Sequence, residues 1–173
     1  MTHNLSLGIY LEDIGELLPW GTPLGELYNI ANPIVQKGRD VIRLYWNNHS
    51  ILGGIKSQIE ASFYMNRPDL LDFPNAKGTL EMVSLNFYNS EQIHARQQHQ
   101  QLKDKFIRAL GKPSFDGMGE APFSDLPYTE WDLDDVLVVL KVFERFGEYC
   151  VGKIWHKPLP AWRAKTLSKS DES

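Results

Sequence analysis

Among the side chains that could do chemistry, the densest group is acidic and lies in "YTEWDLDD". Its members are Glu130, Asp132, Asp134 and Asp135. Carboxylates this close together raise one another's pKa values or attract a cation. The segment lacks the glycine and the alternating ligands of a calcium loop, so the spacing predicts the rim of a hairpin rather than a metal site. Such an acidic rim could still face a basic protein.

Two further pairs contain the residue types used for metal binding and nucleophilic catalysis. His94 and His99 are five residues apart, which on a helix points them in different directions, so we interpret them as part of a solvated helix face. Cys150 and His156 lie six residues apart on an expected strand, about 20 Å at about 3.3 Å per residue. They cannot form a nucleophile and base pair, and Cys150 is expected to be a small core residue. We predict no catalytic residue, no metal and no cofactor.

Bulk composition narrows the classes of partner. The 173 residues carry a formal net charge of -4, and their lysines and arginines are scattered, so nucleic acid is not an expected partner. A single cysteine excludes an internal disulfide framework. The first twenty residues lack the basic and apolar regions of an export signal, and the longest aliphatic run, "VLVVL", is too short to span a bilayer. We expect a soluble, cytoplasmic protein of bacterial type that does not enter membranes.

Hydrophobic periodicity predicts two helices and six strands. The helices are expected at 22–31, with Thr22 as cap and Pro23 at its first position, and at 90–111, with Asn89 or Ser90 as cap. Strand alternation marks 41–46, 53–65, 79–88, 128–134, 136–146 and 148–156. Residues 136–154 also satisfy some helical spacings, so a helix there stays open.

The two halves of the chain show matching positions. Pro33 aligns with Pro113, and after a loop longer by five residues Trp46 aligns with Trp131. Duplication and convergent patterning both explain such matches. We predict an α+β fold of two tandem helix-then-three-stranded antiparallel units that share one core, with the helices on one face of the sheet. The units are 1–89 and 90–156, and 157–173 is expected to be a polar, partly disordered tail.

The pairs "LYNIANP" with "FIRALGKP" and "WNNHSIL" with "WDLDDVL" carry a resemblance of arrangement. The tandem layout resembles the beta-lactamase inhibitory protein family and SmpA/OmlA-type small domains, and more loosely the small immunity proteins that neutralise bacterial toxins. This chain lacks the export signal and paired cysteines of the secreted inhibitors. The resemblance implies a sheet with an open face that binds a protein.

Alternation also predicts which side chains occupy that open face. They are large, amphipathic and of both charge signs, a mixture that suits protein recognition better than catalysis. The expected partner-binding residues are Arg43, Tyr45, Lys56, Gln58, Glu60, Tyr64, Tyr88, Tyr128, Glu130, Asp132, Lys141, Phe143, Arg145 and Trp155, and Ser84, Asn86 and Lys153 share the face. An ordinary solvated face is the plain alternative.

The leading hypothesis is a non-enzymatic protein-binding protein, most concretely an immunity protein that occludes a cognate toxin. A rival hypothesis is a small-ligand-binding or enzymatic domain that uses a groove between the halves, with Glu130 and Asp132 as acids. A third is a homodimer whose open faces pack together.

Overall fold

The structure, a computed structural model, describes residues 4–65, 69, 73–119, 125–161 and 163. Its elements, in chain order, are β1 (Gly8–Leu11), β2 (Glu16–Pro19), α1 (Leu24–Leu27), β3 (Ile34–Lys37), β4 (Val41–Ile51), β5 (Ile55–Tyr64), β6 (Met82–Phe87), α2 (Ala95–Leu110), β7 (Phe115–Met118), β8 (Pro127–Asp132), β9 (Val136–Glu144) and β10 (Glu148–His156).

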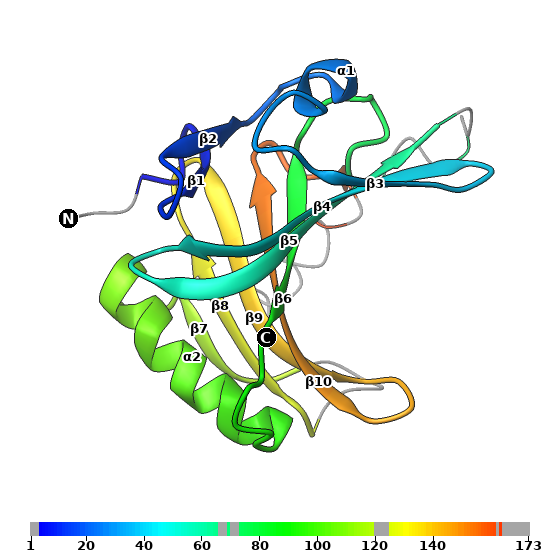
Figure 1. The fold of residues 1–173 in the computed structure, drawn as a ribbon. Coiled ribbons are helices and arrows are strands. Elements are labelled where there is room, and N and C mark those ends of the chain that lie inside the picture. The colour runs from blue at the N-terminus through cyan, green and yellow to red at the C-terminus, as the bar shows by residue number, and fades with distance from the viewer. Residues whose placement is uncertain (1–3, 66–68, 70–72, 120–124, 162, 164–173) are drawn as a thin grey trace.

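Eight strands form one antiparallel sheet in the order β3-β4-β5-β6-β10-β9-β8-β7, and β1 and β2 form a separate two-stranded sheet. The central contact is the pairing of β6 with β10, which runs from Met82 opposite Trp155 to Asn86 opposite Val151. This pairing joins the first four strands of the large sheet to the last four. Figure 1 shows the large sheet strongly curved, with α2 and the β1–β2 hairpin on the same side of it.

The predicted α+β fold of two tandem helix-then-three-stranded units is therefore wrong. Strand makes up 47% of the structure, and the described residues contain only two helices, one of them a single turn. Alternation located the long strands correctly, including β9 and β10, where a helix had stayed open. It missed β1, β2, β3 and β7, because four residues are too few to show a period. It also carried no information on which strands pair across the molecule.

The expected helix over 22–31 shortens to α1, four residues long. Pro23 is its N-cap, and the Thr22 hydroxyl donates to the carbonyl of Pro19 instead of accepting from the first turn. Ala31 and Asn32 both take left-handed backbone conformations, with φ of 56° and 51°, which a continuing helix cannot contain. So short a helix gains little from its own hydrogen bonds and depends on the burial of Leu24 and Leu27.

One hydrophobic core lies between the sheet and the elements that cover its inner side. Trp46 on β4 and Trp131 on β8 are both buried there. Their indole N–H groups donate to the carbonyls of Ile30 at 2.8 Å and Gly111 at 2.9 Å, so neither polar atom is left without a partner. Phe106 of α2 packs against Trp131 with ring centroids 5.5 Å apart. The core thus contains residues from both halves of the chain.

Helix α2 contributes a buried polar contact as well as its apolar stripe. His99 is 3% exposed, and its Nε2 lies 3.1 Å from the hydroxyl of Thr129 on β8 and 3.3 Å from the carbonyl of Leu140 on β9. The Thr129 hydroxyl in turn contacts Asp116, which pairs with Lys103. The interpretation of both histidines as a solvated face is wrong for His99 and holds for His94, which is exposed.

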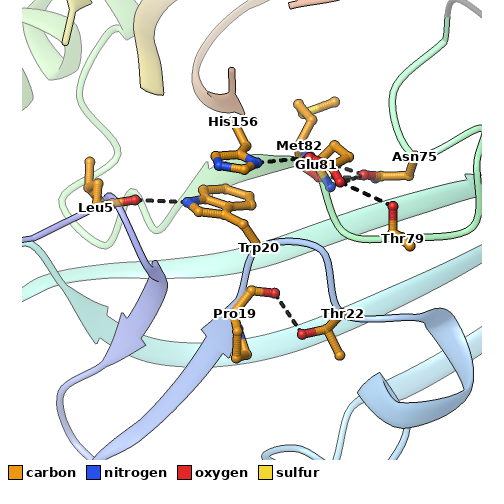
Figure 2. A network of polar contacts seen from close by, with 9 residues as sticks. All are labelled: Leu5, Pro19, Trp20, Thr22, Asn75, Thr79, Glu81, Met82 and His156. Atoms are coloured by element: carbon orange, nitrogen blue, oxygen red, sulfur yellow. Dashed lines mark hydrogen bonds and ion pairs between the residues drawn. The ribbon is translucent and has the colours of Figure 1, made fainter. Parts of the chain in front are cut away.

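A second polar network surrounds the start of β6 and connects it to β5 and to the end of β10. Asn75 is 2% exposed; its Oδ1 accepts from the backbone N–H groups of Glu81 and Met82, and its Nδ2 donates to the carbonyls of Ser62 and Met82. Figure 2 shows the Glu81 carboxylate reaching the His156 imidazole, at 2.9 Å. The indole of Trp20 stacks on that imidazole with a centroid distance of 5.4 Å.

The Asn75 network makes a testable prediction. Asn75→Ala removes four hydrogen bonds and leaves buried backbone groups without partners, so we expect the free energy of unfolding to fall by about 2–4 kcal/mol. The measurement is urea denaturation, with Asn29→Ala, at an exposed position, as the matched control. Equal midpoints for the two variants would show that the network does not hold the strands together.

His99 predicts a pH dependence of stability. Burial lowers the pKa of His99 below 6.5, and the nearby Lys103 cation adds to the effect. Below about pH 6.5 the unfolded chain therefore binds more protons than the folded one, and the free energy of unfolding falls as the pH drops toward 5. The pKa values of Asp13, Asp116 and Glu148 are also lowered, but these carboxyl groups affect the free energy of unfolding at more acidic pH. Denaturation of His99→Gln between pH 7 and 5 should show a flatter profile than the parent protein; an unchanged slope refutes this role.

Candidate functional site

The side of the large sheet that faces away from α2, called here the polar face, is the candidate site. On β5 the residues alternate strictly between the two sides. Ser57, Ile59 and Ala61 are buried in the core, whereas Gln58 and Glu60 are half-buried. Because paired residues of antiparallel strands share a side, the register extends this face across the sheet, from Glu60 to Ser84 of β6 and on to Lys153 of β10.

The structure brings most of the predicted partner-binding residues together on this face. Nine of them are half-buried or exposed and lie on it or directly after β6: Arg43, Tyr45, Lys56, Gln58, Glu60, Tyr64, Tyr88, Lys141 and Phe143. Tyr128 is also half-buried on this face. Arg145 lies in the turn between β9 and β10.

Trp155 and Glu130 point to the same side but are not open to solvent. Trp155 is 4% exposed and packs with Met82, Leu137 and Val139, and Leu159 from the chain beyond β10 packs against that cluster. Glu130 is 7% exposed, and its carboxylate accepts hydrogen bonds from Tyr128 and Arg163. The cause is that residues 157–161 and Arg163 lie over one end of the polar face. The prediction of a polar tail missed this placement; its last ten residues, 164–173, lie outside the described residues.

Asp132, the second acid considered for catalysis, is also held in an ion pair. Lys157 donates to its carboxylate and to the carbonyl of Leu133. Asp134 and Asp135 complete the acidic group of the β8–β9 turn. Within the described part of the chain, no group of three or more histidine, cysteine or acidic side chains could hold a metal ion.

One groove among the described residues is lined by both halves of the chain. It has a volume of about 330 Å³ between the β4–β5 turn and α2, and its lining consists of Leu52, Gly53, Gly54, Lys105, Arg108 and Ala109. Glu130 and Asp132 are not part of it. The backbone N–H groups of Gly53 and Gly54 are already bound by the Glu12 carboxylate.

Two lysines lie side by side near the centre of the polar face. Lys141 of β9 is opposite Val151 of β10, and Lys153 is two residues further along β10, so the two are diagonal neighbours. Diagonal neighbours on one face are about 7–8 Å apart, within reach of long side chains. Both are half-buried, and within the described residues neither ammonium group has a hydrogen bond or an ion pair.

The surroundings of the lysines oppose their positive charge. Burial, together with the cations of Lys153 and Arg163, lowers the pKa of Lys141 to about 8. Burial and Arg163 also lower the pKa of Lys153, and the Glu60 carboxylate offsets part of that effect. Cations that are desolvated and pushed together in this way are expensive to hold in a folded protein.

The charges around the pair do not balance. Four cations, Arg43, Lys141, Lys153 and Arg163, share this part of the face with two carboxylates, Glu60 and Glu130. The difference, four minus two, is a local excess of two positive charges among the described residues, in a chain whose net charge is -4.

Sequence reasoning placed Lys153 on the face but missed Arg163. The guanidinium of Arg163 donates to the Tyr128 hydroxyl at 2.7 Å and to Glu130 at 3.2 Å. The signal that could have revealed it is the apolar stretch "PLPAW" directly before it, which is unusual for a solvated tail.

At the end of the face beyond the lysines, aromatic side chains are exposed. Tyr149 of β10 is 50% exposed and lies 5.7 Å from the ring of Phe143, its partner on β9. Tyr88 follows β6 toward the same end and is equally exposed, and Phe146 in the β9–β10 turn is 96% exposed. These four residues are called the aromatic end.

Comparisons with protein families, with curated proteins and with solved structures found no match to this chain. Among the described residues, no helix is both long enough and apolar enough to cross a membrane. Cys150 is buried, as predicted, and burial raises the pKa of its thiol to about 12.

The lysine pair predicts a gain in stability on mutation. Lys141→Met removes a desolvated cation, and we expect the free energy of unfolding at pH 7 to rise by about 1–2 kcal/mol. In the folded state Lys141 has a pKa of about 8, whereas the unfolded chain holds this proton up to about pH 10.5. The advantage of the variant should therefore shrink between pH 8 and 10.5. Chemical denaturation across this range, with the exposed Lys105→Met as control, measures it; a loss of stability would contradict the assignment.

Proposed function

We propose that this chain is a non-enzymatic protein-binding protein that recognises its partner through the polar face and the aromatic end. One observation carries the proposal. Phe146 combines almost complete exposure with a left-handed backbone, φ 56°, at the tip of the β9–β10 turn. A bulky residue in that conformation costs about 1–2 kcal/mol. Folding gains nothing from it, since asparagine or glycine would satisfy the same turn without the cost.

The neighbours of Phe146 favour a protein as the ligand. Aromatic side chains dominate the binding energy of protein interfaces, especially beside polar and charged groups that fix orientation. Tyr149 and Phe143 supply further aromatic area, and the lysine pair supplies charge. A face built on β-strands is also rigid, so little ordering is required when the partner docks.

The most specific form of the proposal is an immunity protein of bacterial type, which neutralises a cognate toxin in the cytoplasm by covering its working surface. The open face supports this form, because a non-catalytic inhibitor acts through a surface of this kind. The charge of the partner differs from the sequence-based expectation of a basic toxin. Glu130 and Asp132 are neutralised by Arg163 and Lys157, and the remaining excess is positive, so the complementary partner surface is acidic.

The same excess disfavours a homodimer in which two polar faces pack together, because that arrangement would oppose two clusters of like charge. The enzymatic alternative is weakened by the engagement of both of its candidate acids and by their absence from the groove beside α2.

The proposal is tested by co-expression with the products of adjacent genes, followed by calorimetry on any complex. Phe146→Asn should keep or raise stability, because asparagine tolerates φ > 0, while weakening partner binding by about tenfold or more. Tyr149→Ala should weaken binding similarly. Tyr10→Ala, equally exposed on β1, is the matched control and should bind like the parent. If no adjacent product binds, or if Tyr10→Ala is the damaging change, the proposal fails.

A further inference from the structure

The lysine pair differs from the other half-buried basic side chains among the described residues. Those side chains form ion pairs: Lys103 pairs with Asp116 at 2.9 Å, and Arg163 pairs with Glu130 at 3.2 Å. Lys141 and Lys153 are more enclosed than a typical surface lysine, yet within the described residues no carboxylate comes within ion-pair distance of either. A half-buried charge without a partner is costly, and such a charge is retained where a ligand supplies the missing counter-charge.

The nearest carboxylates are held away from the pair by other groups. Glu60 receives hydrogen bonds from Ser62 and Asn86 and lies 3.8 Å from Arg43. Glu130 is held by Arg163 and Tyr128. Because these hydrogen bonds direct both carboxylates elsewhere, they leave the two ammonium groups as unneutralised donors.

Neutral hydrogen-bonding groups line the same place. Ser84 of β6 is directly opposite Lys153, and among the described residues its hydroxyl has one hydrogen-bond partner, the sulfur of Met82 at 3.9 Å. The hydroxyl can turn toward a ligand at little cost, because a hydrogen bond to sulfur at that distance is weak. Two ammonium groups and one hydroxyl, all on adjacent strands of one rigid sheet, form a donor set for an oxyanion.

We propose that Lys141 and Lys153, with Ser84, form a binding site for one oxyanion group, a carboxylate or a phosphate. The site deepens the proposed function and rests on it in one respect: in a complex, the anion is presented by the partner's acidic surface. Its chemistry can be measured on this protein alone.

The test is a titration of the full chain with sulfate and with malonate, followed by amide NMR shifts or by calorimetry. Both probes stay dianionic from pH 7 to 9, so a pH effect reports on the protein. We expect dissociation constants of about 1–10 mM, with shifts centred on β9 and β10. Lys141→Met with Lys153→Met should weaken binding at least about tenfold, and Lys105→Met should leave it unchanged.

The pH profile is a second readout. The charged and titratable groups that face Lys141 are Lys153 and Arg163, with Tyr128 opposite it and Glu60 and Glu130 nearby. Burial and the neighbouring cations lower the pKa of Lys141 to about 8, and the pKa of Lys153 is lowered as well. Binding should therefore weaken between pH 7 and 9, and the decline should be less steep in Lys141→Met.

The two probes also identify the source of the anion. Tighter malonate assigns the site to carboxylates, as on an acidic protein surface, and tighter sulfate assigns it to phosphate-like groups. No binding of either probe up to about 20 mM, or equal binding by the double variant, overturns the site. Phe146→Asn should not change either titration. Anion binding without any protein partner would thus leave the site standing while the proposed function fails.

Discussion

The pairing of β6 with β10 is the interaction on which the rest of the structure depends. It is a contact between strands more than sixty residues apart in the chain, and it turns two four-stranded ribbons into one sheet. Without it, α2 and the β1–β2 hairpin would each cover a separate small sheet, and neither half would bury enough apolar surface. The contacts of Asn75 with Met82 and of Glu81 with His156 lie at one end of this seam.

One continuous sheet with α2 and the β1–β2 hairpin on one side leaves most of the other side to the polar face. The buried side supplies the stability, which is why the polar side can hold features that cost stability. These are a lysine pair with no counter-charge among the described residues, a strained and exposed Phe146, and exposed tyrosines. Their shared position is informative, because selection for folding alone would not concentrate destabilising residues on one surface. Residues 157–161 and Arg163 cover one end of this face, where the apolar cluster around Trp155 lies.

Periodicity in the sequence predicted the features that depend on the spacing of neighbouring residues. The alternation of β4, β5, β9 and β10, the course of α2 and the burial of Cys150 follow from side-chain spacing, and most of the face residues follow from the same pattern. The fold class was wrong because strand pairing is a long-range property and because β3 and β7 are too short to show a period. Trp155 and Glu130 were placed on the correct side but expected in solvent, since strand alternation does not show that Leu159 and Arg163 lie over them.

The most direct test of this account is an NMR measurement of cross-strand contacts between β6 and β10 in solution. The account predicts nuclear Overhauser effects that link Ser84 with Lys153 and Asn86 with Val151, together with slow amide exchange along both strands. If these contacts are missing and both strands exchange as fast as the edge strands β3 and β7, the single sheet does not form, and the polar face and its lysine pair lose their structural basis.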